Sequence, residues 1–359
     1  MTMESLLRMV VERRASDLHI KAGNRPMLRI DGALVPAADE HLPDERVRAL
    51  VAEILSAEQL DTFHRHLELD MAYSLPGLSR FRVNIYQQRG GLGAAIRTIP
   101  DAIPTIEDLR LPKVVTRLAS LPRGLVLVTG PTGSGKSTTL AAIVNHINRA
   151  RSCHIVTIED PIEYMHHDDK CMITQREVGA DTHSFSDALR HVLRQDPDVI
   201  LIGEMRDHET IATAITAAET GHLVLATLHT VNAAQTVDRI IDVFPPHQQP
   251  QIRMQLSVAI EGVLSQTLLP RLGERGRVAA VEVMVGTPAI RNLIRESKTH
   301  QITSTMQAGF KDGMQTLNQA LRQLIKERVI TFETALAHTS SPQELTQLLG
   351  RENSQVASL

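Results

Sequence analysis

The feature that most constrains the fold is a phosphate-loop pattern, G-x-x-x-x-G-K-[ST], matched at every fixed position. An apolar run at 125–128 precedes it and predicts a buried parallel strand, and 140–147 predicts a helix after it. Glycines let the backbone curl, so that successive N–H groups and the helix N-terminus face phosphates. The pattern therefore predicts a nucleoside triphosphate site formed by Gly130, Pro131, Thr132, Gly133, Ser134, Gly135, Lys136, Ser137 and Thr138.

Within this loop two side chains have the chemistry that a bound triphosphate needs. Lys136 can reach the β- and γ-phosphates, and the hydroxyl of Ser137 can bind Mg²⁺. A glycine-rich turn that only joins a strand to a helix would not need this Lys-Ser pair. ATP and Mg²⁺ are therefore the expected ligands.

Composition excludes several other classes of protein. The 359 residues allow about two domains, and a hydrophobic content of 42% is typical of a chain with a buried core. A net charge of −3, the absence of Trp and an aromatic content of 3% argue against a nucleic-acid partner. Residues 1–11 contain Glu4 and Arg8, which indicates an amphipathic helix and not a signal peptide.

No apolar run approaches the length of a membrane span, and the chain has only two cysteines, Cys153 and Cys171. They lack the spacing of a zinc site and are too few for a disulfide framework, so the reducing cytoplasm is the expected compartment.

The first hundred residues predict a small α+β domain. Short strands are expected at 17–21 and 26–30, a helix after Pro43, and a hairpin at 79–99 with apolar residues at every second position. Three arginines lie on or beside this hairpin. They either form a solvated strand face or reach a nucleotide held by the second domain or by a neighbouring subunit; they are Arg80, Arg82 and Arg97.

Prolines at 100, 104 and 112 predict a semi-extended linker over 101–112 that acts as a hinge. After the phosphate loop, three further strands are expected at 154–158, 198–202 and 222–227, each followed by polar residues and separated by helices. Strands that alternate with helices predict a parallel sheet, whose carboxyl ends form the usual ligand edge. We therefore expect these polar clusters to converge on the phosphate loop.

Acidic residues follow two of these strands. Glu204 is the candidate carboxylate linked to Mg²⁺, although a strand-end acid that caps a loop is the simpler alternative. Glu159, Asp160 and Glu163 include a candidate base for the attacking water, or else form a solvated acidic turn. Glu163 is favoured because Pro161 turns the chain before it.

Histidines lie at both ends of the strand expected at 222–227. His222 and His229 are each either satisfied strand-end residues or phosphate sensors, and His229 is the better candidate because it follows the carboxyl end. The run 166–169, His-His-Asp-Asp, suggests a metal site, but a solvated loop is favoured because adjacent histidines do not easily aim at one ion.

Beyond residue 237 the sequence predicts helices at 238–246 and 251–266, a strand at 277–285, and a helical region over 286–359 whose tail, 351–359, is disordered. Thr287 and Pro288 are typical of a helix start. The helix that follows places three aliphatic residues on one face and two arginines on the other. Its residues are Ala289, Ile290, Arg291, Asn292, Leu293, Ile294, Arg295 and Glu296.

Seven segments together resemble the secretion ATPase superfamily, and specifically its pilus-retraction branch. They are 15–19, 80–84, 130–139, 158–164, 198–207, 222–230 and 289–296, the last being similar to the branch's AIRNLIRE motif. The resemblance implies a PAS-like domain over 1–100, a RecA-like ATPase domain over 113–285, and a ring-shaped homohexamer. It also implies that the AIRNLIRE helix is needed for retraction.

The same resemblance implies a role for each candidate residue. Lys136 and Ser137 would hold phosphate and Mg²⁺, Glu163 would be the general base and Glu204 the Walker B acid. The remaining assignments are γ-phosphate sensing by His222 and His229 and nucleotide contact by Arg82 and Arg97.

The reaction that the resemblance implies is ATP hydrolysis coupled to pilus disassembly. It would take place in the cytoplasm at the inner-membrane pilus base, through a platform protein. An accessory retraction ATPase that works with a paralogue, and a nucleic-acid translocase, are the alternatives.

Overall fold

The computed structural model describes residues 1–30, 32–99, 102–273 and 276–356, with side chains to residue 350. The chain divides into two compact units. The first comprises Met1–Ala102 together with Pro161–Met165, and the second comprises Ile103–Asp160 and His166–Leu359. Each unit has its own hydrophobic core.

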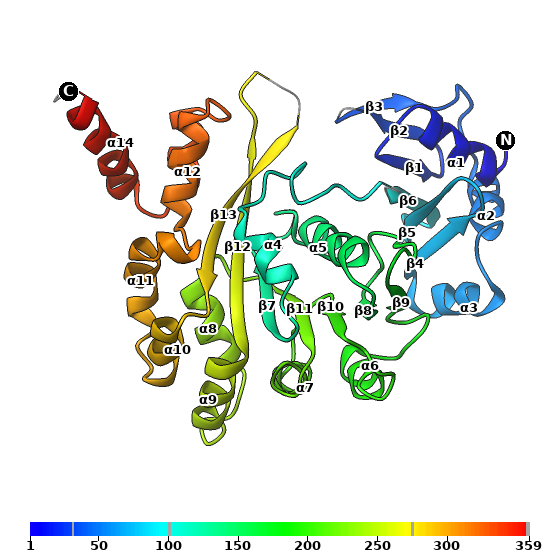
Figure 1. Ribbon diagram of the computed structural model, residues 1–359. Coiled ribbons are helices and arrows are strands. Elements are labelled where there is room, and N and C mark those ends of the chain that lie inside the picture. The colour runs from blue at the N-terminus through cyan, green and yellow to red at the C-terminus, as the bar shows by residue number, and fades with distance from the viewer. Residues whose placement is uncertain (31, 100–101, 274–275, 357–359) are drawn as a thin grey trace. The chain divides into compact units, whose positions relative to one another are not determined.

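The first unit is a six-stranded antiparallel sheet with three helices (Figure 1). Its strand order is β3-β2-β1-β6-β5-β4. The elements are α1 (Met3–Glu12), β1 (Asp17–Lys21), β2 (Met27–Ile30), β3 (Ala33–Pro36), α2 (Asp44–Ala52), α3 (Ala57–His66), β4 (Glu68–Leu75), β5 (Ser79–Gln88) and β6 (Gly91–Ile99).

Periodicity in the sequence explains this core. In α1, Met3, Leu6, Leu7 and Val10 recur at helical spacing and are fully buried, which confirms the predicted amphipathic helix. In β5, Phe81, Val83 and Ile85 are buried and alternate with more exposed residues, which confirms the predicted period of two. The expected PAS-like character of this unit stays a prediction.

The second unit is built on a seven-stranded sheet of order β13-β12-β7-β11-β10-β8-β9, in which only the β12–β13 pair is antiparallel. The predicted α/β fold with a parallel-rich sheet is therefore confirmed. The strands are β7 (Gly124–Thr129), β8 (His154–Glu159), β9 (Met172–Glu177), β10 (Val199–Ile202), β11 (Leu223–Leu228), β12 (Ile260–Pro270) and β13 (Arg277–Val285).

Helices cover both faces of this sheet (Figure 1). In β7, Leu125 and Leu127 face a core shared with α6 (Phe185–Val192), α7 (His208–Glu219), α8 (Ala233–Asp242) and α9 (Gln249–Ala259). Val126 and Val128 face the opposite core with α4 (Val114–Ala119) and α5 (Lys136–Ala150). A strand buried on both faces reads as a continuous apolar run, which is the signal that predicted it.

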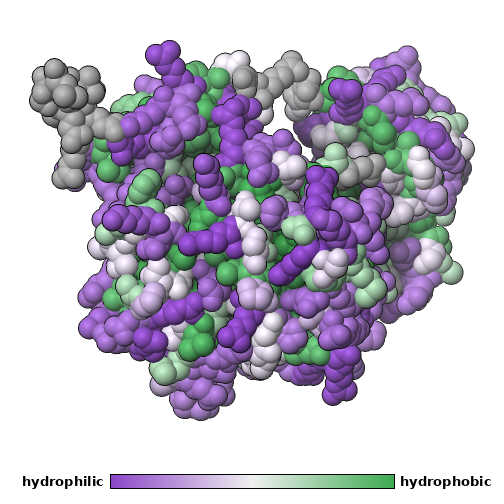
Figure 2. Space-filling model, viewed as in Figure 1, coloured by the Kyte–Doolittle hydropathy of each residue, from purple (hydrophilic) through white to green (hydrophobic). Residues whose placement is uncertain are grey.

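The helices that follow the β12–β13 hairpin are α10 (Pro288–Arg295), α11 (Ile302–Ala308), α12 (Leu317–Lys326), α13 (Phe332–His338) and α14 (Pro342–Val356), with short 3₁₀ turns at Thr299–Gln301 and Phe310–Asp312. The buried residues of α10 and α11 join the main core with α8 and α9, whereas α12, α13 and α14 pack with the hairpin around a smaller core that includes Leu269, Val278 and Leu321. The expected disordered tail differs, because α14 continues to Val356; the last three residues lie outside the described part. Figure 2 shows a largely hydrophilic face with apolar residues in small patches.

Two further expectations were wrong. The helix predicted over 251–266 ends at Ala259, and the chain continues as β12, which lies between β7 and β13 and is buried along most of its length. Periodicity cannot separate a fully buried strand from a buried helix. The linker expected over 101–112 also differs in its described part, since Ile106 and Leu111 are buried in the second unit's core and Asp108 caps a turn at Thr105; residue 101 lies outside the described residues.

The two cysteines are free thiols whose sulfur atoms lie 3.3 Å apart. Burial, followed by the neighbouring Cys171, raises the pKa of Cys153 to about 11, so this thiol is protonated and poorly reactive at neutral pH. Among the described residues, no helix combines the length and the apolar composition that crossing a bilayer needs.

Candidate active site

The phosphate loop joins β7 to α5 through glycines that no other residue could replace without a clash or strain. Gly135 has φ +90° and occupies the N-cap of α5. Gly130 has φ +138°, and a Cβ there would lie 2.4 Å from the carbonyl oxygen of Gln266 and 2.6 Å from Ser134 Oγ. The loop can therefore curl tightly only with glycine at these two positions.

Polar groups of the loop fit an anionic ligand. Ser134 is 3% exposed, and its Oγ has no hydrogen-bond partner among the described residues. Lys136 Nζ donates to the carbonyl oxygens of Gly130 at 3.0 Å and Pro131 at 3.2 Å, so the amine is held over the loop. Orphan donors and a cation at a helix N-terminus are what a polyphosphate would satisfy.

Strand β12 supports the loop from one side, which sequence reasoning missed. Ser265 Oγ lies 2.8 Å from Thr129 Oγ1, and Gln266 Nε2 donates to Thr139 Oγ1 at 2.9 Å. All four side chains are buried. Polar residues inside an apolar run could have indicated this support of the phosphate loop. The signal was missed because 251–266 was predicted to be a helix.

Glu204 and His229 meet at the carboxyl edge of the sheet. Glu204 follows β10, His229 follows β11, and His229 Nε2 lies 3.1 Å from Glu204 Oε1. Leu228 is paired with Thr129, so His229 and Gly130 leave adjacent strands at the same level. The expected convergence of these two side chains beside the phosphate loop is therefore observed.

Arg206, which sequence reasoning left without a role, binds the other oxygen of this acid: Arg206 Nη2 lies 2.8 Å from Glu204 Oε2. Burial alone would raise the pKa of Glu204, but the Arg206 hydrogen bond and the charges of His229 and Arg206 lower it overall. The carboxylate is therefore ionised at neutral pH, the state needed to bind a hydrated cation.

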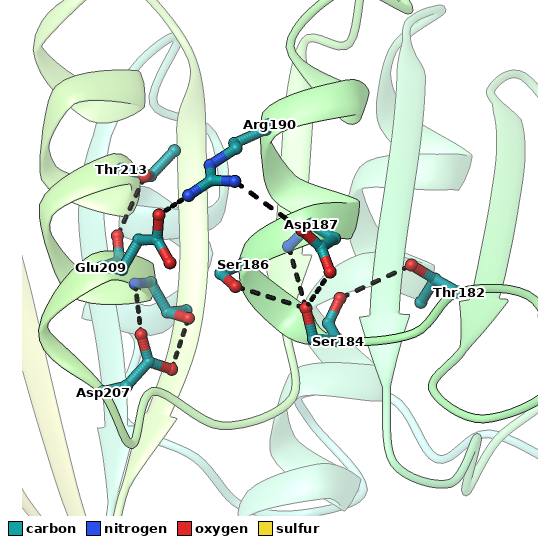
Figure 3. Close-up of polar contacts among 9 residues, drawn as sticks. Thr182, Ser184, Ser186, Asp187, Arg190, Asp207, Glu209 and Thr213 are labelled. Carbon is teal, nitrogen blue, oxygen red and sulfur yellow. Dashed lines mark hydrogen bonds and ion pairs between the residues drawn. The ribbon is translucent and has the colours of Figure 1, made fainter.

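The chain after Glu204 is fixed by the start of α7 (Figure 3). Asp207 caps this helix by accepting from the Thr210 N–H at 2.8 Å and from its hydroxyl at 2.7 Å. Arg190 of α6 forms ion pairs with Glu209 of α7 and, at 3.7 Å, with Asp187. These contacts hold α6 and α7 together next to the Glu204 loop.

His222 does not reach this edge within one chain, which argues against its expected role as a γ-phosphate sensor. It precedes β11, its carbonyl accepts from the Gly124 N–H at 3.0 Å, and its Nδ1 lies 2.9 Å from the carbonyl oxygen of Ala217. The six residues of β11 then separate it from His229 by roughly 20 Å. His222 is a satisfied strand-end histidine.

The acidic cluster after β8 is divided between the two units. Glu159 Oε1 accepts from Thr157 Oγ1 at 2.7 Å and from Gln175 Nε2 at 3.2 Å. Asp160 is close enough to Arg206 to raise the pKa of that guanidinium, a smaller effect than that of Glu204. Glu163 is exposed and lies in Pro161–Met165, which packs with the first unit. Its role as general base stays a prediction.

The run at 166–169 contributes to loop structure. Asp168 Oδ1 accepts from the Ile173 N–H at 3.0 Å, and the Asp169 N–H donates to Asn148 Oδ1 at 3.1 Å. Burial, followed by the charge of His167, lowers the pKa of His166 to about 4. In the described parts of the chain, no three His, Cys, Asp or Glu side chains gather to hold a metal ion.

A cavity of about 390 Å³ opens beside the phosphate loop within the second unit. The residues preceding α4, the first turn of α5 and the β12–β13 hairpin line it, including Arg110, Leu111, Thr138, Leu268 and Arg271. It is large enough for a nucleoside. The sequence offered no local signal for this cavity, because three segments distant in the chain form it.

In the first unit, Arg82 and Arg97 lie directly opposite each other on β5 and β6, and both are exposed. Directly opposed residues of antiparallel strands share a face. The two candidate arginines therefore form one cationic surface of this unit, whose contact with a nucleotide stays a prediction.

Helix α10 carries the eight-residue motif, and Thr287 caps it, as predicted. Ile290 and Ile294 are fully buried. Arg291, which was expected on the face opposite the aliphatic residues, is bound to neighbouring elements: its Nε donates to the Gly286 carbonyl at 2.7 Å and its Nη2 to Glu261 Oε1 at 2.6 Å. This residue is part of the packing, whereas Arg295 is exposed.

Comparisons with known proteins identify the family of this chain. A family model described as Type II/IV secretion system protein matches residues 1–337. The chain is 50% identical to the type IV pilus retraction ATPase PilT of Pseudomonas aeruginosa, over 96% of this chain and 99% of that one. It is 44% identical to the type IV pilus ATPase PilU of the same organism, over 97% and 91%.

Among solved structures, the crystal structure of the pilus retraction motor PilT with bound ADP superposes with a TM-score of 0.91 at 46% identity. The match covers 97% of this chain and 99% of the other. A chain of this similarity shares the fold over both units.

Proposed function

Because this chain belongs to the Type II/IV secretion system protein family, we propose that it is an ATP-hydrolysing motor that powers type IV pilus retraction. The observation that carries the proposal is the edge at which the phosphate loop, Glu204 and His229 leave adjacent strands of one sheet. The similarity to a retraction ATPase and to a retraction motor with bound ADP supports the same conclusion.

The proposed mechanism assigns a task to each group. The loop N–H groups and Lys136 bind the phosphates, and the cavity beside Leu268 receives the nucleoside. Ser137 and, through water, Glu204 would hold Mg²⁺, which supplies charge neutralisation on the phosphates. Glu163 accepts the proton of the attacking water, and His229 relates the state of the γ-phosphate to Glu204.

The assembly that we propose is a homohexamer, in which Arg82 and Arg97 contact a nucleotide of the same or a neighbouring subunit. Pilus retraction further requires an inner-membrane platform protein as partner, so the motor would act from the cytoplasmic side of the pilus base. The net charge of −3 gives no reason to add nucleic acid to these partners.

The proposal is tested first by hydrolysis. The purified protein is expected to release phosphate from MgATP, and Lys136→Ala to lower kcat/KM by about a thousandfold, since the cation that binds the phosphates is lost. Lys113→Ala, a lysine next to α4, is the matched control and should keep wild-type kinetics. Absence of hydrolysis by the wild-type protein with magnesium would refute the ATPase assignment.

Retraction itself is tested in cells that lack both of their own retraction ATPases. Pili that withdraw when this chain alone is supplied would support the motor. The similarity to PilU favours a second candidate function, that of an accessory retraction ATPase. In that case retraction would return only when a PilT-type protein is supplied as well.

The two histidines give a further prediction. His229→Gln is expected to lower kcat by about tenfold, because Glu204 loses a neighbour at 3.1 Å in the site. His222→Gln should leave kcat within about twofold, since it lies at the opposite end of β11. Equal effects of both substitutions on kcat, at unchanged thermal stability, would contradict the assignment.

A further inference from the structure

A row of four charged residues crosses the sheet of the first unit at one register level. Asp17 of β1 lies opposite Arg29 of β2 on one side and Arg97 of β6 on the other. Arg97 in turn lies opposite Arg82 of β5. Because directly opposed residues share a face, the single carboxylate of this row lies beside one of the two candidate nucleotide-contacting arginines.

Asp17 is a rigid anchor within this row. It is 7% exposed, its Oδ1 accepts from Arg97 Nε at 2.8 Å, and its Oδ2 accepts from Ser16 Oγ at 2.8 Å. Arg29 Nε is more distant from Oδ2, at 3.9 Å, and Arg29 Nη1 donates to the carbonyl of Gly32. The strong contact of Asp17 is therefore with Arg97.

The hydrogen bond to Asp17 leaves the two terminal nitrogens of Arg97 available for another contact. The Arg97 side chain is 68% exposed although its Nε is bound, so its terminal nitrogens Nη1 and Nη2 remain for another acceptor. A guanidinium is planar, and fixing Nε restricts the plane in which the two terminal nitrogens are presented. A side chain held in this way loses less conformational freedom when it binds an anion.

We propose that Asp17 is a positioning residue that orients Arg97 for contact with the triphosphate. The inference rests on the proposed function, in which Arg97 contacts a nucleotide. It adds a residue of the first unit to the hydrolysis machinery and gives the buried carboxylate a task other than holding the sheet together. It also predicts that Asp17 acts on turnover only through Arg97.

A double-mutant cycle on the full-length protein tests this dependence. Arg97→Ala is expected to lower kcat for MgATP by about a hundredfold or more, and Asp17→Ala by about tenfold, each with a small change in KM. The double variant should be no more than about twofold slower than Arg97→Ala alone. A merely structural role of Asp17 would instead slow the double variant by the further tenfold.

Two variants sharpen the result. Asp17→Asn keeps an oxygen that can accept from Arg97 Nε, so it should recover most of the kcat lost in Asp17→Ala. Arg29→Ala, the matched control, removes the arginine on the other side of Asp17 and should leave kcat within about twofold. Thermal unfolding of every variant checks that losses of kcat are compared among folded proteins.

The outcomes separate this inference from the proposed function. Failure of the wild-type protein to hydrolyse MgATP would remove the function itself. If the wild-type protein hydrolyses ATP, then wild-type kcat in Asp17→Ala or in Arg97→Ala, or multiplicative losses in the double variant, would overturn the positioning role of Asp17.

Discussion

Glu204→Gln is expected to lower kcat for MgATP hydrolysis by about a thousandfold and to leave nucleotide binding within about threefold. The substitution keeps the size of the side chain and removes its charge. It also places an amide NH₂ where the carboxylate accepts from either Arg206 or His229, so one of those contacts becomes donor against donor. Binding is retained because the phosphate loop belongs to another element.

The measurement is steady-state phosphate release, together with equilibrium binding of a fluorescent nucleotide. Glu209→Gln is the matched control, because Glu209 lies in the first turn of α7 and pairs with Arg190 of α6 (Figure 3). It should keep kcat within about twofold. Wild-type turnover in Glu204→Gln would show that the acid at this strand end has no part in hydrolysis.

The phosphate loop could be predicted from sequence because its signal is local. Glycines, the Lys136–Ser137 pair and the flanking strand and helix all lie within about 25 residues, so periodicity and motif spacing contain the whole structure. Glu204 and His229 could also be predicted from a local signal. Each follows a short apolar strand, and a parallel sheet necessarily brings its strand ends to one edge.

What the sequence could not predict depends on contacts between distant segments. The apolar pattern of residues 260–270 fits a buried helix as well as a buried strand. Only the position of this segment between β7 and β13 shows that it is a strand. The resemblance implied a phosphate-sensing role for both His222 and His229, but the two residues lie at opposite ends of β11, and the direction of that strand separates them. The fixed position of Arg291 depends likewise on α9 and β12.

Arg291 gives the second large expected effect, because it joins three elements. Its Nη1 donates to the carbonyl oxygens of Ser257, at 3.1 Å, and Val258, in the last turn of α9. These carbonyls have no partner within the helix, and a cation at a helix C-terminus is favourable. Its Nη2 binds Glu261, which lies at the irregularity where β12 shifts register against β7, the strand of the phosphate loop.

Arg291→Ala is therefore expected to destabilise the second unit by about 2–4 kcal/mol, since it leaves several acceptors and one partly buried carboxylate without their donor. Thermal unfolding should show this as a Tm lowered by about 5–10 °C. Arg291→Lys should recover little of the loss, because one ammonium cannot reproduce the planar fork that reaches Gly286, α9 and Glu261 together.

Arg295→Ala is the matched control on the same helix. Arg295 is exposed, and its Nη2 donates to Asn292 Oδ1 at 3.3 Å, so its loss should change stability by less than about 0.5 kcal/mol. If α10 acts on pilus retraction through its outer residues, Arg295→Ala should impair retraction while MgATP hydrolysis and Tm remain unchanged. Arg291→Ala should reduce all three, and an unchanged Tm in that variant would refute its role as the residue that fastens α10 to the sheet.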